Sequence, residues 1–240
     1  MVCGIDCGST KTLSYVAWLD TTLNEFMLDA YIPDFARGDV LPKFAHGAPA
    51  YVGLDCPQGL PNPDSGRLCR KSDQIAKTPT KKMAMTRGEL ETGIFYGREI
   101  VRLGIDLFWT LYSNDRAAIY GLSNLDVSNL EVNVQVTVFE TYPRYALETL
   151  FGLKSSIQHI PSKRKDPLSY IQKIWSLIQN LGYTCQGGGP HTVDDVDAML
   201  CAIAAEQLSQ CVACRVGNPP SVDHDGQVLR EGYIVVPTRK

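Results

Sequence analysis

The sequence predicts an α/β protein with a mixed central sheet, antiparallel strands at its N-terminus and helices on both faces. Three short apolar segments, 2–6, 12–19 and 25–32, are joined by tight turns, which is typical of consecutive antiparallel hairpins. Residues 132–138 alternate valine with polar side chains, which is the period of a strand with one buried face. Later segments place apolar residues at helical spacing, so helices and strands are mixed along the chain.

Length and composition limit what the protein can be. A chain of 240 residues with 44% hydrophobic and 20% charged residues is typical of a globular protein, and we expect a single domain over residues 1–240. The net charge of −3 argues against a globally basic nucleic-acid-binding protein, although local patches can still bind phosphate. No apolar run approaches the roughly 20 residues of a membrane helix, and the N-terminus lacks the pattern of a signal peptide. We therefore expect a soluble, cytoplasmic protein that does not contact a membrane.

The other elements follow from apolar spacing and turn residues. Residues 50–55 suit a short buried strand, and 57–87 is rich in Pro, Gly, Ser, Lys and Arg, which predicts a long basic surface loop with short helices at most. A helical pattern covers 89–113, where the apolar residues are Ile94, Phe95, Val101, Ile105 and Phe108. Further helices are expected at 144–151, from Pro167 to a stop at Gly182, and from Thr192, before a terminal strand at 232–237.

Glu140 is informative because of its place in the alternating strand. It shares the parity of the valines from Val132 to Val138, so it continues the buried face. A buried carboxylate costs several kcal/mol unless it is paired, hydrogen-bonded or bound to a metal. The alternative is that the strand has already ended and Glu140 is a solvated turn residue.

The helix that begins near Thr192 carries further acids. Asp194 and Asp197 are three residues apart and lie on one face, which Cys201 continues as the apolar face. Asp195 fits a capping box with Thr192. The alternative is that these acids only compensate the helix dipole, which explains one of them better than all three.

Acids thus follow apolar strands or begin a core-facing helix at several separate places. The candidates are Asp6, Asp55, Glu140, Asp194 and Asp197. Carboxylates that converge repel one another, and the usual remedy is a divalent cation such as Mg²⁺ or Mn²⁺. Two such ions can activate water and stabilise the leaving oxygen of a phosphodiester.

The order of several motifs resembles a known family. The hairpin start with an aspartate on the first strand and the terminal D-x-x-D-A helix resemble the RNase H-like superfamily, and "DDVDAMLCAIAA" is similar to the terminal helix of Holliday-junction resolvases. The chain more closely resembles the family called domain of unknown function 429, described as predicted RNase H-like nucleases. The motifs that carry this resemblance are "GIDCGS", "GLDCPQGLP", "RLCRKSD", "FETYPRYAL", "DDVDAMLCAIAA" and "EGYIVVP".

The resemblance implies an RNase H-like fold and a metal-dependent nuclease or phosphodiesterase acting on a nucleic acid or nucleotide. On the matched positions it implies that Asp6, Asp55, Glu140 and Asp197 are the catalytic metal ligands, with Asp194 as a further metal-binding acid. The activity of the family is itself inferred from fold and acids.

Basic residues near the acids are candidates for substrate binding. Arg67, Arg70 and Lys71 follow the Asp55 turn and can be expected to contact a phosphate. Arg144 follows Glu140 closely and is placed to orient a carboxylate. The alternative for these residues, and for the basic run at 162–165, is a solvated surface.

Two other functions fit parts of the chain. "GIDCGSTKT" is similar to the first phosphate loop of the actin, chaperone and sugar-kinase ATPases, in which Ser9 and Thr10 would hold phosphate, and "CQGGGP" has the glycines of a nucleotide-binding turn. The chain is short for the duplicated core of those ATPases. A non-catalytic nucleic-acid-binding module is the third alternative.

The cysteines do not predict a zinc site. Cys211 and Cys214 form a CxxC motif, but no second pair has the spacing of a structural zinc site. We expect the eight cysteines to be mostly small buried residues in a reducing compartment.

Overall fold

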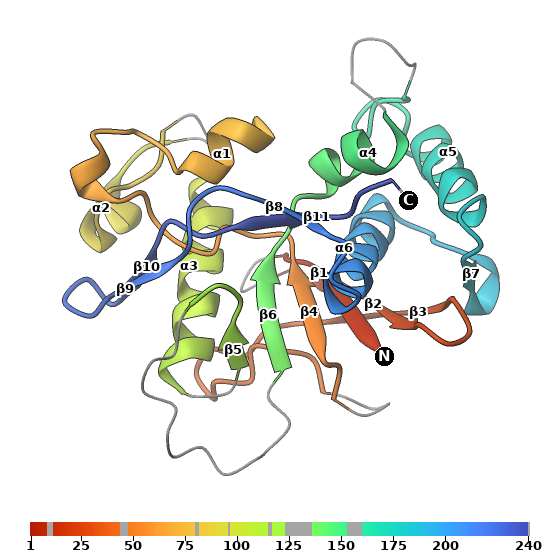
Figure 1. Ribbon diagram of the computed structural model, residues 1–240, viewed down its shortest axis with the longest axis horizontal. Helices are drawn as coiled ribbons and strands as arrows, with labels where there is room; N and C mark the ends of the chain where they lie inside the picture. Colours follow the sequence, from red (N-terminus) through yellow and green to blue (C-terminus); the bar gives the residue numbers. More distant parts are fainter. Residues whose placement is uncertain are drawn as a thin grey trace.

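The protein has one mixed sheet between two layers of helices. The computed structural model describes residues 1–8, 12–43, 48–79, 82–95, 97–114, 117–122, 136–152 and 160–239. In this part of the chain the main sheet has the strand order β7–β3–β2–β1–β4–β6–β11–β8, with β5 also paired to β6 (Figure 1). The strands of the main sheet are β1 Val2–Asp6, β2 Ser14–Asp20, β3 Glu25–Tyr31, β4 Tyr51–Leu54, β5 Ala117–Ile119, β6 Val136–Glu140, β7 Thr184–Cys185, β8 Cys214–Val216 and β11 Ile234–Val236. A small second sheet pairs β9 Ser221–Asp223 with β10 Val228–Arg230.

The N-terminal strands pair as the sequence predicts. β1, β2 and β3 form antiparallel hairpins, with Gly4 opposite Ala17. On its other side β1 pairs in parallel with β4, and β4 pairs in parallel with β6. The register places Leu54 beside both Ile5 and Glu140. The carboxyl ends of β1, β4 and β6 therefore meet at one edge of the sheet.

Helices cover both faces of the sheet. α4 Pro143–Phe151, α5 Pro167–Gln179 and α6 Val193–Ser209 pack with Phe139 in one core cluster. α3 Arg98–Ser113 packs with Ile5, Leu54 and Val138 in another cluster. Figure 1 shows α3 and α6 on opposite sides of β4 and β6. This mixed α/β arrangement is consistent with an RNase H-like fold.

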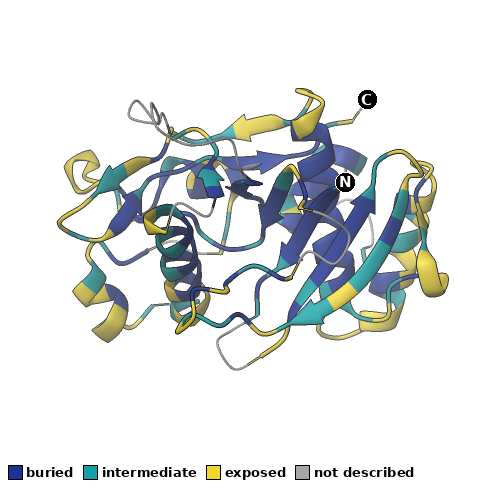
Figure 2. Cartoon of the chain, turned by 90° about the horizontal axis from the view of Figure 1, so that it is seen from below, coloured by how far each residue is buried: buried dark blue, intermediate teal, exposed yellow. Residues whose placement is uncertain are grey.

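Two glycines let α6 lie directly against the sheet. A Cβ added to Gly4 would lie 2.1 Å from the carbonyl oxygen of Ala198 and 2.1 Å from the amide nitrogen of Ala202. A Cβ on Gly53 would lie 2.7 Å from the carbonyl oxygen of Cys201. Main chain therefore contacts main chain between α6 and the strands β1 and β4. Burial is concentrated in the central strands and the helices against them (Figure 2).

A Gly4→Ala variant is expected to be destabilised by about 1–3 kcal/mol or more, because neither clashing atom belongs to a side chain that can move aside. The free energy of unfolding in urea measures the effect. Gly88→Ala is the matched control, since its new Cβ would meet only the Thr86 Oγ1, at 4.0 Å, within α2 Arg87–Thr92. That control is expected to be neutral or slightly stabilising, because alanine favours helices. Equal stability of Gly4→Ala and wild type would contradict the close approach.

The helical pattern at 89–113 divides into two helices. α2 ends at Thr92, and α3 begins after Gly97, whose left-handed φ of 73° interrupts the helix. The prediction that Ile94 lies within the helix is wrong, since Ile94 lies between α2 and α3 and is fully exposed. Val101, Ile105 and Phe108 are buried as predicted. No helix in the described residues is long and apolar enough to cross a membrane.

The basic segment 57–87 contains the short helices η1 Pro63–Ser65 and α1 Lys71–Ala76. It is less exposed than the sequence predicts, because part of it pairs with the end of β10. The amide of Leu60 donates to the carbonyl of Leu229 at 2.9 Å, and the amide of Glu231 donates to the carbonyl of Leu60 at 2.7 Å. Arg70 and Asp73 from the same segment are also buried.

Candidate functional site

Four aspartates, from β1, from the residue directly after β4 and from α6, lie near the carboxyl ends of the strands. Side chains alternate between the two faces of a strand, so Asp6 points to the same face as Gly4, and Asp55 points to the same face as Gly53. Both glycines face α6. Asp194 and Asp197 lie in the first two turns of α6, which begins at the same edge of the sheet. Thr192 and Asp195 form the predicted capping box, so Asp195 has a structural role.

The four carboxylates influence one another strongly. Burial and then the charges of Asp55, Asp197 and Asp194 raise the pKa of Asp6 well above its ordinary value. Burial, followed by Asp197, raises the pKa of Asp55 to about 8, although Lys163 acts in the opposite direction. These effects oppose the simultaneous ionisation of Asp6 and Asp55 unless a positive charge lies nearby.

Lys163 supplies that positive charge. Its ammonium forms an ion pair with the Asp197 Oδ2, and it lies 5.3 Å from the centre of the Tyr170 ring. The other carboxylate oxygen, Asp197 Oδ1, is buried and has no hydrogen-bond partner. The Oγ1 of Thr141, which follows β6 beside Asp55, is also buried without a partner. Unpartnered buried oxygens of this kind are costly in a protein interior.

Carboxylate oxygens are the ligands that hard divalent cations prefer, and Asp197 Oδ1 has no hydrogen-bond partner within the protein. In the present arrangement Lys163 is bound to Asp197. Across the described residues, no three His, Cys, Asp or Glu side chains are placed to hold one ion together. A cation that binds the four aspartates therefore competes with Lys163 for Asp197.

Glu140 is buried, so its interpretation as a solvated turn residue is wrong. It lies on the α3 side of the sheet, like Val138, and its carboxylate is held by Arg70, whose Nη2 donates to Oε1 at 2.7 Å. The amide of Gln58 donates to Glu140 Oε2 at 2.8 Å. Both oxygens of Glu140 thus have protein partners, and we leave Glu140 out of the ligand set proposed below.

Arg70 is buried and binds carboxylates of the protein rather than a substrate. It is 0% exposed and also donates to Asp73, from Nε at 2.8 Å and from Nη2 at 2.9 Å. The expectation that Arg70 neutralises a substrate is corrected accordingly, since its guanidinium neutralises Glu140 and Asp73. Arg67 and Lys71 are half-buried and do not line either cavity beside the aspartates.

The residues that would bind phosphate in the ATPase alternative are not found together beside the aspartates in the described part of the chain. Ser9 and Thr10 lie outside the described residues. The glycine run follows β7, which pairs with the outer edge of β3, so two strands separate it from β1. Gly187, Gly188 and Gly189 have positive φ, and Gln186 bonds to Glu25 of β3 at 2.9 Å.

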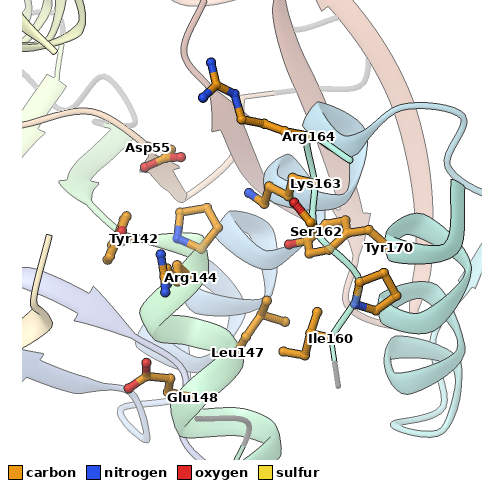
Figure 3. A pocket seen from close by; sticks show the side chains of 12 residues that line it. Asp55, Tyr142, Arg144, Leu147, Glu148, Ile160, Ser162, Lys163, Arg164 and Tyr170 are labelled. Carbon is orange, nitrogen blue, oxygen red and sulfur yellow. The ribbon is translucent and has the colours of Figure 1, made fainter. Parts of the chain in front are cut away.

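Two cavities meet at Asp55 and Tyr142. The smaller, about 200 Å³, is lined by Asp6, Asp55, Glu140 and Thr141 among others. The larger, about 440 Å³, extends from Asp55 along the start of α4 to the segment before α5. Figure 3 shows the Lys163 ammonium directed toward the side of this cavity where Asp55 lies. Sequence reasoning treated Lys163 only as part of a basic run and missed Tyr142 and Tyr170.

Residues 4–221 match the family described as Protein of unknown function (DUF429). The chain belongs to this family. No curated protein and no solved structure gives a significant match. The DUF429 match includes Asp6, Asp55, Asp194 and Asp197, so it covers every acid of the site.

The cysteines of this DUF429 protein are all free, and most are buried. Cys7 and Cys56, which follow Asp6 and Asp55, have their sulfur atoms 3.3 Å apart. A hydrogen bond from Cys7, followed by burial, raises the pKa of Cys56 well above its ordinary value, so this thiol stays protonated. Cys211 and Cys214 of the CxxC motif are exposed.

The raised pKa values predict an unusual pH dependence for this DUF429 protein. Without metal, the stability that Asp6 and Asp55 contribute is full below their unfolded pKa of about 4 and is lost as the pH rises through their folded pKa values. For Asp55 that window extends from about pH 4 to about pH 8. We expect the melting temperature in EDTA to fall between pH 5 and pH 8 by an amount that corresponds to about 1 kcal/mol or more.

An Asp55→Asn variant is expected to flatten this dependence, because its amide does not ionise. Thermal unfolding in EDTA at several pH values measures both proteins. A melting temperature of wild type that rises over the whole range would contradict the prediction.

Proposed function

We propose that the protein is a divalent-cation-dependent phosphodiesterase that acts on nucleic acids or nucleotides. The observation that carries this proposal is the mutual charge effect among Asp6, Asp55, Asp194 and Asp197, which come from separate elements, together with a buried Asp197 oxygen that has no partner. Such a cluster is unfavourable for folding unless it binds a cation, so its presence indicates a function. The basic and aromatic side chains beside Asp55 fit a substrate that carries phosphate.

In this proposal the four aspartates hold Mg²⁺ or Mn²⁺. Such a cation, held by these carboxylates, would supply Lewis-acid chemistry: a lower pKa for a water molecule and stabilisation of the leaving oxygen. Lys163, which lines the same cavity and pairs with Asp197, would neutralise a phosphate oxygen of the substrate. Arg144 lines the other side of that cavity and orients the phosphate. The Arg70 network holds the segment after β4 in place beneath the aspartates.

The test is cleavage of single-stranded DNA, duplex DNA, branched DNA, RNA and a small chromogenic phosphodiester, each with Mg²⁺, with Mn²⁺ and with EDTA. Metal-dependent hydrolysis of at least one substrate is expected. Asp6→Asn is expected to lower that rate at least about a hundredfold, because it removes a charged ligand. Asp225→Asn, at an exposed aspartate between β9 and β10, is the control that should keep wild-type activity.

Two outcomes would count against the proposal. Hydrolysis that is equal in wild type and Asp6→Asn would identify a contaminating enzyme. Binding of nucleic acid that is unaffected by EDTA and yields no product would favour the non-catalytic module.

A further inference from the structure

The larger cavity has features that the four aspartates do not explain. It holds about 440 Å³, which is within the range of small-molecule sites and suits one nucleotide rather than a base-paired duplex. Asp55 lies at one end, so a ligand in the cavity adjoins the acidic cluster (Figure 3). The opposite wall, formed by Leu147 and Ile160, is apolar.

The cavity carries positive charge on two sides. Arg144 and Lys163 both line it, and Arg164 lies at its rim. α4 begins here with Pro143, and no side chain caps its N-terminus. The unpaired N–H groups of a first helical turn favour an anion, and a phosphate beside two basic side chains satisfies them. One acid of α4, Glu148, also lines this cavity.

A further feature is the hydroxyl group of Tyr170 on α5, which lies close to Asp197 and Lys163. Tyr170 lines the cavity, is only 3% exposed, and its hydroxyl has no hydrogen-bond partner. A buried hydroxyl without a partner is costly, so an acceptor supplied by a ligand would stabilise it. Tyr142, half-buried on another side of the cavity, offers an aromatic surface.

We propose that this cavity binds a single unpaired nucleotide. Its phosphate lies between the N-terminus of α4, Arg144 and Lys163, and its base lies against Tyr142, Leu147 and Ile160. The inference deepens the proposed function, on which it rests, by assigning an unpaired nucleotide as the unit that the site recognises. The nucleotide comes either from a free nucleoside monophosphate or from the end of a single strand, since both present the same chemistry.

The test is calorimetric titration of the full chain in EDTA, where metal-dependent hydrolysis does not occur. The ligands are nucleoside monophosphates, the matching nucleosides, inorganic phosphate, a short 5′-phosphorylated single strand and its duplex. A monophosphate is expected to bind with a Kd below about 1 mM, and more tightly than either the nucleoside or inorganic phosphate. Affinity about tenfold higher for the strand than for the monophosphate would assign the strand end, and equal affinity would assign the free nucleotide.

Variants test the location of the site. Arg144→Gln is expected to weaken binding about tenfold or more, and Tyr170→Phe several-fold. The melting temperature of Tyr170→Phe is measured as well, so that a loss of binding is distinguished from a loss of stability near Asp197. Arg102→Gln, at an exposed arginine of α3 on the other face of the sheet, should bind like wild type.

The inference is overturned if no ligand shows saturable binding, if the duplex binds as tightly as the single strand, or if Arg144→Gln and Tyr170→Phe leave affinity unchanged. Cleavage with such a negative titration would refute the inference and leave the proposed function standing. Nucleotide binding that depends on Arg144 and Tyr170, without any cleavage, would refute only the phosphodiesterase.

Discussion

An Arg70→Met variant is expected to lose about 3–5 kcal/mol of unfolding free energy, which is the usual cost of removing one partner from a buried ion pair. Arg70 is 0% exposed and holds two buried carboxylates, those of Glu140 and Asp73. Without the guanidinium, both acids are left in the interior with few donors. Urea unfolding followed by circular dichroism measures the loss.

Arg37→Met is the matched control, because Arg37 pairs with Asp34 on the surface, where the two side chains are 81% and 45% exposed. Its expected effect is at most about 1 kcal/mol. A double variant, Arg70→Met with Glu140→Leu, should recover part of the stability, since one stranded carboxylate is then removed. An Arg70→Met protein as stable as the control would show that the buried network contributes little.

A Lys163→Met variant is expected to change the protein in two opposite ways. In EDTA its stability should fall by about 1–2 kcal/mol, a loss moderated by solvent because the Lys163 side chain is 39% exposed. With Mg²⁺ or Mn²⁺, the variant should gain more stability than wild type, since no ammonium competes for Asp197. Its affinity for the metal should rise about tenfold.

Thermal unfolding with increasing metal concentration, together with calorimetry, measures both effects. Lys165→Met is the control, because Lys165 is an exposed residue of the same segment and forms no ion pair among the described residues. If Lys163→Met binds metal more weakly than wild type, Lys163 supports the cation site and does not compete with it.

The sequence predicted those parts of the fold that local patterns determine. The hairpins follow from short apolar segments with tight turns, and the start of α6 follows from the capping box of Thr192 and Asp195. Ile94 was placed wrongly because apolar spacing continues across a break that depends on Gly97 taking a left-handed conformation.

The acids show what the alternation of side chains along a strand can and cannot predict. Parity correctly placed Glu140 on the buried side of its strand. It did not indicate which helix covers that side, and Glu140 faces α3 whereas Asp6 and Asp55 face α6. The partners of these acids also depend on contacts distant in sequence. Arg70 reaches Glu140 across 70 residues, and Lys163 reaches Asp197 across 34.

The glycines at positions 4 and 53 have a consequence for how this centre tolerates change. Because α6 meets β1 and β4 through main-chain atoms at these two glycines, the glycines set the gap between the two sets of negative charges. Exchanging neighbouring core residues should leave that gap the same, whereas any larger residue at either glycine would widen it. The distance between the acids of the strands and those of the helix is therefore fixed by two residues that carry no charge themselves.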